Sequence, residues 1–307
     1  MEKKKRGKPI FSKNLQLWML CIIPLLQIFI FAYIPMGGLV IAFKDYNYSK
    51  GIFGSDWVGF DNFSVFLKSA DFIRTTWNTL YMNFLFIIFG TVAALLVAIL
   101  LFSIKSRNAT KVYQTTMIMP YFLSWVVVSY MAYAILHPSY GVLNGILASF
   151  GLEKVDWYSK PDAWPAILTV CYIWKHVGMD SIIYYAALMG VDSSLYEAAD
   201  LDGANAVQKT FYVTLPTISG LIIIMTILKI GGIMRADFGL FYQISRDAGA
   251  LYSKTDVIDT YIFRTMRVIG DMGLSSAVGF MQSVVGCILV IVTNGIVSKI
   301  DSEKSLF

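Results

Sequence analysis

Four long stretches of the chain contain no Asp, Glu, Lys or Arg, and this feature most limits what the chain can fold into. A helix of about 20 apolar residues crosses a bilayer, because its backbone groups bond to one another inside the helix. Two further apolar runs, residues 164–189 and 217–234, are interrupted by only a few charges. The sequence therefore predicts an integral membrane protein. The uncharged stretches are residues 14–43, 75–104, 112–152 and 272–298.

Composition predicts the same class of protein. The 307 residues are 57% hydrophobic and 15% charged, with a mean hydropathy of +0.63, whereas a soluble domain usually has about 25% charged residues. Cys21, Cys171 and Cys287 all fall within the apolar runs and lack disulfide or metal spacing. We expect these cysteines to act as small packing residues, and we expect no metal site.

The apolar runs predict an all-α membrane domain of six spans over residues 18–298. A basic tail, residues 1–17, precedes it, and a short tail, residues 299–307, follows it. The first run is too long for the core of a signal peptide, so we expect it to remain as a helix. Pro24 and Pro35 should kink this helix or mark its upper end. The expected spans are residues 18–43, 77–102, 113–136, 164–189, 217–234 and 277–298.

Basic residues near the first spans predict the orientation. The loop after the second span has three basic residues and no acid, and the first 13 residues are also strongly basic, so both should be cytoplasmic. With an even number of spans, both termini then lie in the cytoplasm of a cell whose plasma membrane holds the protein. Segment 235–271 balances five basic residues with five acids and is assigned outside. The basic residues are Lys3, Lys4, Lys5, Arg6, Lys8, Lys13, Lys105, Arg107 and Lys111.

The segments assigned outside are expected to be ordered. Residues 44–74 are rich in aromatic and turn residues, and residues 142–150 suit a short interfacial helix. The pair Gly231-Gly232 predicts a break near the outer end of the fifth span.

The loop at residues 190–216 departs from the positive-inside trend. It places Asp192, Glu197, Asp200 and Asp202 on the cytoplasmic side against the single base Lys209. The pair Ser194 and Glu197 predicts a helix that starts with a capping box, and Gly203 should separate two short helices. An exposed acidic helix of this kind favours a protein partner.

The loop also resembles a known motif. The residues Glu197-Ala198-Ala199, a gap of three residues, Gly203, a gap of nine residues and Val213-Thr214-Leu215-Pro216 are similar to the EAA loop of bacterial ABC importer permeases. The resemblance implies a type I ABC importer permease bundle with a cytoplasmic coupling helix. The coupling residues it implies are Glu197, Ala198, Ala199, Asp200, Gly203, Leu215 and Pro216.

A simpler interpretation of the same residues exists. Glu197 alone could serve only to favour the start of a helix, and the two alanines could serve only to raise helix propensity. The match over the whole spacing favours the coupling interpretation, in which small alanines let the helix lie in a groove of an ATPase.

A second resemblance concerns the cargo. The stretch YIPMGGLVIAFKDYN at residues 33–47, with Trp57-Val58-Gly59 and Asp61-Asn62-Phe63, resembles maltose-type permeases that import complex oligosaccharides and polysaccharide fragments in Gram-positive bacteria. It implies a second, similar permease, two cytoplasmic ATPase subunits and an extracytoplasmic sugar-binding lipoprotein. No nucleic-acid partner is expected.

The chain has no phosphate-binding Gly-x-x-x-x-Gly-Lys-Ser/Thr run. We therefore expect ATP and Mg to bind on the separate ATPase, with no cofactor and no enzymatic activity in this chain.

Charged residues inside spans indicate where a polar cargo could pass, since each costs about 2.5 to 3.5 kcal/mol to insert. His176 and Asp180 are four residues apart, on one face of the fourth span. The alternative is that Lys175 and Asp180 satisfy each other or a neighbouring helix. We expect Asn83 to make a packing hydrogen bond. The candidate path residues are Trp174, Lys175, His176, Asp180, Tyr184, Lys229 and Gln282.

Two other classes of function remain open from the residues. One is half of an ion-coupled secondary transporter, with Asp180 and Lys175 as coupling charges. The other is a membrane subunit that docks a cytoplasmic protein without transporting anything. The first leaves the EAA spacing unexplained, and the second predicts no polar path.

Overall fold

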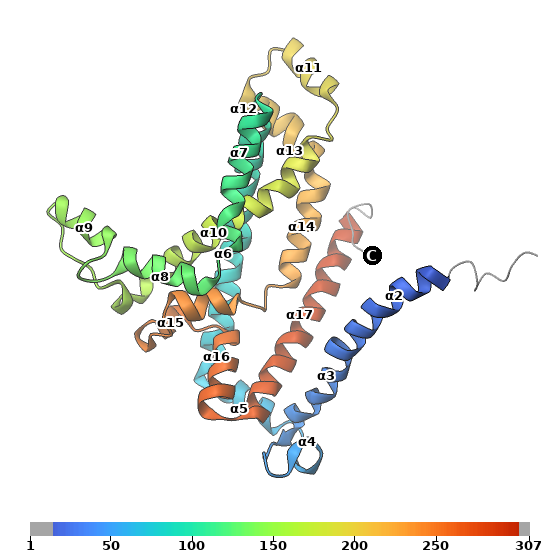
Figure 1. Cartoon of the computed structure of the whole chain (residues 1–307), viewed down its shortest axis with the longest axis vertical. Helices are drawn as coiled ribbons and strands as arrows, with labels where there is room; N and C mark the ends of the chain where they lie inside the picture. Colours follow the sequence, from blue (N-terminus) through green and yellow to red (C-terminus); the bar gives the residue numbers. More distant parts are fainter. Residues whose placement is uncertain (1–14, 301–307) are drawn as a thin grey trace, which may run out of the picture.

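The computed structural model describes residues 15–300 and consists almost entirely of helices (Figure 1). Four helices in this part of the chain are long and apolar enough to cross a membrane, and two bent pairs raise the number to as many as six. The expected all-α, multi-span fold is confirmed. Most of the two predicted tails lies outside the described residues. The four helices are Trp18–Phe43, Ala70–Phe102, Pro161–Leu188 and Met272–Lys299.

Most of the first span stands apart from the other helices, and its last turn, residues 37–43, packs against the final helix (Figure 1). No residue of its most apolar window is buried. A π-helical turn at Phe29–Tyr33 comes directly before Pro35, which has no backbone N–H to donate, and the α-helix ends at Met36. Pro35 therefore lies near the end of the helix, as expected. The elements are α2 (Leu15–Ile28), η1 (Phe29–Tyr33), α3 (Ile34–Met36) and η2 (Gly37–Phe43).

The loop after the first span is ordered, as expected. Strands β1 (Lys44–Asp45) and β2 (Asp56–Trp57) form an antiparallel pair. The buried Lys44 ammonium donates to the carbonyls of Phe53 and Ser55 at 3.0 and 3.2 Å, so its charge is well solvated by backbone. The short helices α4 (Gly51–Gly54) and α5 (Asp61–Lys68) complete the loop.

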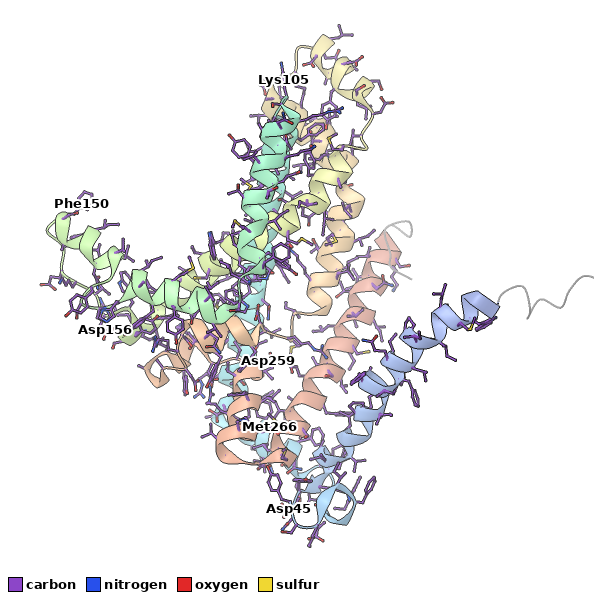
Figure 2. The ribbon with its side chains drawn as sticks, in the orientation of Figure 1. Asp45, Lys105, Phe150, Asp156, Asp259 and Met266 are labelled. Carbon is purple, nitrogen blue, oxygen red and sulfur yellow. The ribbon has the colours of Figure 1, made fainter. Side chains whose placement is uncertain are left out.

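Helices α6 (Ala70–Phe102) and α10 (Trp164–Leu188) form the centre of the bundle. Phe86 of α6 stacks on Tyr172 of α10, with ring centroids 4.3 Å apart. Figure 2 labels Asp45 in the loop before α6 and Lys105 in the loop after it, at opposite ends of the molecule. The second and fourth runs therefore form continuous helices, as expected.

The third run is broken, and the prediction of a single helix at residues 113–136 is wrong. Helix α7 (Arg107–Ile118) and turn η3 (Met119–Phe122) meet α8 (Trp125–Leu136) at 97°. Ser124 accepts a hydrogen bond from the Val127 N–H and so caps the start of α8. The position of α7 is fixed by close packing, since a Cβ on Gly178 of α10 would lie 1.9 Å from the Met117 carbonyl oxygen.

The segment between α8 and α10 contains the expected short helix, α9 (Val142–Ser149). The buried Asn144 side chain holds the segment together, because it donates to the Pro138 and Val155 carbonyls and accepts from the Val155 N–H. Two single turns, η4 (Trp157–Ser159) and η5 (Pro161–Ala163), lead into α10.

The fifth run is also bent. Helix α14 (Ser219–Gly231) ends at the predicted glycine pair but has only 13 residues, and it meets the preceding helical segment Ala206–Thr217 at 66°. The predicted straight span at residues 217–234 is therefore corrected to two helical segments. The elements before α14 are α11 (Ser193–Leu201), α12 (Ala206–Lys209), η6 (Thr210–Thr214) and α13 (Leu215–Thr217).

The last segment before the final helix is held by buried ion pairs. The fully buried Asp256 carboxylate receives Arg74 of α6 at 2.8 Å and Arg264 at 2.6 Å. Asn83 donates to the carbonyls of Ile233 and Arg235, which confirms its packing role. The elements are η7 (Leu240–Ile244), η8 (Gly249–Leu251), α15 (Tyr252–Thr255), α16 (Ile258–Arg264), η9 (Thr265–Ile269) and α17 (Met272–Ile300).

Candidate functional site

The loop formed by α11 and α12 lies at one extreme end of the molecule (Figure 1). Asp192 caps α11 by accepting from the Ser194 N–H at 2.9 Å, and this hydrogen bond holds the pKa of Asp192 below its usual value. The capping box predicted from Ser194 and Glu197 is therefore wrong. Because the cap is made by Asp192, the Glu197 carboxylate stays exposed, and it has no ionic partner among the described residues.

A second cap shapes α12. Asn205 and Gln208 form a reciprocal capping box, with bonds of 2.8 and 2.9 Å. Gly203 lies between α11 and α12 with a φ of +76°, a left-handed conformation that favours glycine. Asp200 of α11 forms an ion pair with Lys209 of α12 at 2.6 Å. The predicted division of the loop into two short helices at Gly203 is confirmed.

The loop is anchored to the bundle on one side and open on the other. The Tyr196 hydroxyl lies 3.2 Å from the Thr214 hydroxyl, and the Tyr196 ring contacts Phe102 at the end of α6. Ala198 is exposed beside Glu197, so small side chains face outward as expected. Several large apolar side chains are exposed with them, which sequence reasoning did not assign to the site: Leu201 (90%), Val207 (65%), Phe211 (61%) and Tyr212 (80%).

Leu215 and Pro216 begin the short helix α13, where the loop joins the fifth span. Proline is tolerated there because the first N–H groups of a helix have no intrahelical partner. The loop is therefore joined to α14 directly, through the 66° bend.

The charged residues predicted to line a path are engaged in contacts between elements. Lys175 is 6% exposed and donates to the backbone carbonyls of Pro120, Tyr121 and Leu123, at the break between η3 and α8. The ammonium thus satisfies carbonyls that a continuous helix would have used internally.

Asp180 of α10 forms an ion pair with Lys229 of α14 at 2.8 Å, with both side chains about one-fifth exposed. Of the alternatives considered, the Lys175–Asp180 pair is not formed, and satisfaction by a neighbouring element is what the structure shows. The fifth span is thereby joined to the fourth by charge as well as by packing.

His176 lies in an aromatic cluster around the break. Its ring stacks on Tyr172 at 4.4 Å and lies 5.8 Å from the Tyr121 ring and 6.0 Å from the Trp125 ring. Trp125 donates its indole N–H to Asp237 at 2.7 Å. Sequence reasoning missed Tyr121, Trp125 and Asp237, although aromatic residues beside Pro120 were a signal of a break in the third run.

The remaining candidates lie elsewhere. Trp174 is 40% exposed and lines an apolar cavity of about 340 Å³ between α8 and α10. Tyr184 is buried in the core at 1% exposure, and Gln282 donates to the Met234 carbonyl and to Asp259. The structure therefore does not bring all seven predicted residues together.

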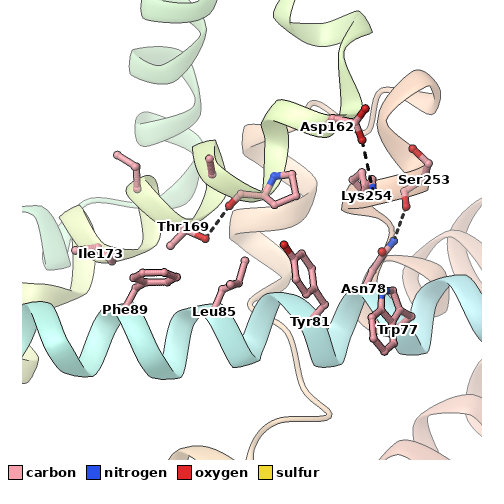
Figure 3. A pocket seen from close by; sticks show the side chains of 13 residues that line it. Trp77, Asn78, Tyr81, Leu85, Phe89, Asp162, Thr169, Ile173, Ser253 and Lys254 are labelled. Carbon is pink, nitrogen blue, oxygen red and sulfur yellow. Dashed lines mark hydrogen bonds and ion pairs between the residues drawn. The ribbon is translucent and has the colours of Figure 1, made fainter.

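A cavity of about 620 Å³ is a groove between α6 and α10 (Figure 3). Figure 3 shows one row of side chains along α6 that faces α10, and an ion pair between Asp162 and Lys254 at 3.6 Å lies at one end. The lining is mainly apolar, so the groove offers few groups to sugar hydroxyls. The row consists of Tyr81, Leu85 and Phe89, and Trp77 lies beside Asn78 at one end of the groove.

Residues 87–301 match the family described as binding-protein-dependent transport system inner membrane component. Protein LplB of Bacillus subtilis (strain 168) is 36% identical over 98% of both chains. The polygalacturonan/rhamnogalacturonan transport system permease protein YteP of the same organism is 32% identical over 98% of this chain and 94% of its own.

Solved structures of transport proteins are also similar to this chain. A chain of a bacterial ABC transporter involved in the import of the acidic polysaccharide alginate superposes with a TM-score of 0.86 and 31% identity, covering 95% of this chain and 98% of its own. A second structure contains the alginate transporter in complex with its alginate pentasaccharide-bound periplasmic protein.

The multi-pass helical bundle, its exposed helical loop and its similarity to transport permeases over nearly the whole chain together identify a membrane transport permease. The chain belongs to the family of binding-protein-dependent transport system inner membrane components, and it is a permease subunit of the ABC transporter class. The family expected from the EAA spacing is confirmed.

Proposed function

We propose that this permease subunit imports an oligosaccharide or polysaccharide fragment by alternating access, driven by a separate ATPase. The observation that carries the proposal is the loop at residues 190–216, which exposes Glu197 and a group of apolar side chains at one end of the bundle. Relatives that transport polygalacturonan, rhamnogalacturonan and alginate support the cargo class.

The coupling route runs from the loop into the spans. An ATPase groove that binds α11 pulls on α12 through the Asp200–Lys209 pair and on α14 through the bend after Leu215 and Pro216. The Asp180–Lys229 pair then carries the movement from α14 to α10. ATP and Mg bind on the ATPase subunits, and this chain contributes no nucleotide site.

A second permease is the proposed partner inside the membrane. The first span is unburied along its whole apolar window, and large side chains such as Phe31 (76%) and Leu20 (70%) are exposed. A single span stabilised by lipid alone gains no specific packing, whereas a neighbouring bundle would give it complementary helix contacts. An extracytoplasmic lipoprotein delivers the sugar on the face opposite the ATPase, and both termini are cytoplasmic.

We place part of the translocation path for the sugar at the aromatic cluster around the break in the third span. His176, Tyr121 and Trp125 offer ring faces and polar edges, which suit sugar rings. Asp180 and Lys229 extend this polar region along α10 and α14, and Lys175 holds the backbone of the break beside it.

The test is ATP-driven uptake of a labelled oligogalacturonate into vesicles that contain the whole importer. We expect Glu197→Ala to lower uptake about tenfold, as for the loss of one coupling contact, while the exposed loop acid Glu153 tolerates the matched Glu153→Ala change. Equal effects of both changes would contradict the coupling role.

The same vesicles distinguish the proposed importer function from the two alternative functions. Uptake driven by an ion gradient without ATP would favour a secondary transporter, for which the part-buried Asp180–Lys229 pair is the relevant observation. ATPase binding without any uptake would favour a docking subunit.

A further inference from the structure

A small polar pocket lies where α8 meets the turn after η7, away from the loop that couples to the ATPase. Its volume is about 230 Å³, and its walls come from two segments more than a hundred residues apart in the sequence. A pocket that encloses a drug-sized ligand usually measures about 300 to 1,000 Å³, so this one suits a single sugar ring. The polar and aromatic residues of the wall are Ser129, Tyr130, Tyr242, Gln243, Arg246 and Asp247.

Arg246 is the cation of this pocket. Its guanidinium carbon lies 4.2 Å from the centroid of the Tyr133 ring, so one face of the planar group is covered by an aromatic ring. The side chain is exposed, and no acidic partner contacts it within the described part of the chain. The N–H groups at its edge are therefore open to a ligand, and their fork matches the two oxygens of a carboxylate.

The acid in the same wall is already neutralised. Asp247 accepts from Arg264 at 3.3 Å and from the Tyr252 hydroxyl at 3.0 Å. Arg264 is held in turn by the buried Asp256 at 2.6 Å, and its guanidinium stacks on the Tyr252 ring. Asp247 is thus drawn toward this network, which reduces its repulsion of an anion beside Arg246.

The backbone conformation that separates the Arg246 and Asp247 side chains costs free energy. Arg246 and Asp247 have φ values of 56° and 46°, the two positive φ values of non-glycine residues among those described. Each such residue costs of order 1 kcal/mol or more and persists only where the surroundings fix it. Here the buried Ile244 and Ser245 anchor the turn, so Arg246 points to the pocket and Asp247 to its ion-pair network.

The rest of the wall suits sugar hydroxyls. Ser129 donates to the Val126 carbonyl at 2.7 Å, which leaves its hydroxyl oxygen able to accept. The Gln243 amide offers both a donor and an acceptor, and Tyr130 and Tyr242 offer hydroxyls and ring faces. One cation, several neutral polar groups and two aromatic rings together match an acidic sugar better than a neutral one.

We propose that this pocket is a subsite for one uronate ring of the cargo, with Arg246 binding the sugar carboxylate. The inference rests on the proposed import of oligosaccharides and adds the chemical class of the cargo. It concerns residues that are separate from the aromatic cluster around the break.

Direct binding tests the subsite without transport. The permease pair is purified in detergent, and its affinity is measured for trigalacturonate and for the neutral trisaccharide obtained by reducing the three carboxyl groups. We expect Arg246→Gln to weaken trigalacturonate binding about tenfold and to leave the neutral sugar unchanged, because one charge-assisted fork is lost. Arg246→Lys keeps the charge without the fork and should give an intermediate loss.

Arg267 provides the matched control, since it is an exposed arginine of the same outer segment with no place in the pocket. Arg267→Gln should bind both sugars as the unchanged protein does. The proposal is overturned if Arg246→Gln and Arg267→Gln behave alike, or if Arg246→Gln weakens both sugars equally. The melting temperatures of all variants are measured as well, so that a general loss of folding is distinguished from a loss of sugar binding.

Uptake by the complete importer separates this proposal from the function on which it rests. If trigalacturonate binds through Arg246 but ATP drives no uptake, the importer function fails and the subsite stands. If ATP drives uptake of both sugars and Arg246→Gln lowers neither preferentially, the subsite fails and the importer function stands. If the unchanged protein binds and transports neither sugar, both proposals fail.

Discussion

At the scale of single residues, buried charges in this protein hold the bundle together at places where regular helix hydrogen bonding stops. Lys175 satisfies three carbonyls at the break in the third span, and Asp180 joins α10 to α14 through Lys229. A buried charge costs free energy unless it is paired or hydrogen-bonded, so these contacts explain how the charges persist in spans.

The capping role of Lys175 predicts a loss of stability when the charge is removed. We expect Lys175→Met to lower the free energy of unfolding by about 1 to 3 kcal/mol or more, because buried carbonyls lose their donor. Thermal unfolding in detergent measures the change, and the exposed Lys160 supplies the control Lys160→Met. Equal melting temperatures for the two variants would show that the carbonyls do not depend on Lys175.

Asp259, labelled in Figure 2, should make the stability of the folded protein depend on pH. Its carboxylate accepts from the Ala236 N–H at 2.7 Å and the Gln282 amide at 3.0 Å, but burial outweighs these bonds and raises the pKa of Asp259 above its ordinary value of 3.8. The folded state therefore favours the protonated acid, and this contribution to stability is present below pH 3.8 and lost as the pH rises through the raised pKa.

Asp259→Asn removes the titration while its side-chain oxygen still accepts both hydrogen bonds. We expect the melting temperature of the unchanged protein, relative to Asp259→Asn, to fall as the pH rises from 3.8 towards neutrality. A difference that is constant over this range would contradict the raised pKa. Asp259→Ala should be less stable than both at every pH, since two donors lose their acceptor.

At the scale of elements, breaks between helical segments shape the molecule as much as the regular helices do. The third span bends by 97° and the fifth by 66°, and each bend lies beside a residue proposed to take part in the function. The two short helices of the exposed loop are likewise separated by a left-handed glycine. Such breaks allow one segment to move without melting its neighbours, as the proposed coupling to an ATPase requires.

At Gly203 the backbone conformation, and not a lack of space, limits which side chains the position accepts. A Cβ there would meet nothing within 4 Å, so any cost of a side chain arises from the φ of +76°. We expect Gly203→Ala to reduce ATP-driven uptake and to cost about 1 kcal/mol, whereas Gly203→Asn should be milder because Asn tolerates this conformation. Uptake assays and thermal unfolding distinguish the variants, and an alanine variant as active as the asparagine variant would contradict the argument.

At the scale of the whole molecule, the first span and the rest of the bundle have different surroundings. Its most apolar window has no buried residue, whereas one-third of the corresponding window of α6 is buried. Large exposed apolar surfaces in a membrane subunit face either lipid or another subunit. The proposed second permease accounts for an open first span.

Site-specific photo-crosslinking tests this arrangement. A photo-reactive residue in place of Leu26, which is 51% exposed on α2, should form an adduct with the second permease in the assembled importer. The same residue in place of Leu101, which is 3% exposed within the bundle, should form none. Adducts of Leu26 with lipid alone would show that the first span does not contact a partner permease.

The sequence by itself determined the class of fold and the position of the exposed loop at residues 190–216. Uncharged runs longer than a bilayer crossing leave a helical bundle as the solution, and a short motif with fixed spacing needs no tertiary contact to be recognised. The glycine positions were predicted for the same reason, since Gly203 and the Gly231-Gly232 pair act on the local backbone.

Only the tertiary structure decided the partners of the charged residues and the bends. Lys175 binds carbonyls more than fifty residues away, and Lys229 binds an acid 49 residues away, so periodicity along the chain could not pair them. The break in the third span likewise depends on a donor that α10 supplies. Hydropathy measures transfer into lipid residue by residue, whereas these contacts depend on which helices meet, and that is settled by packing.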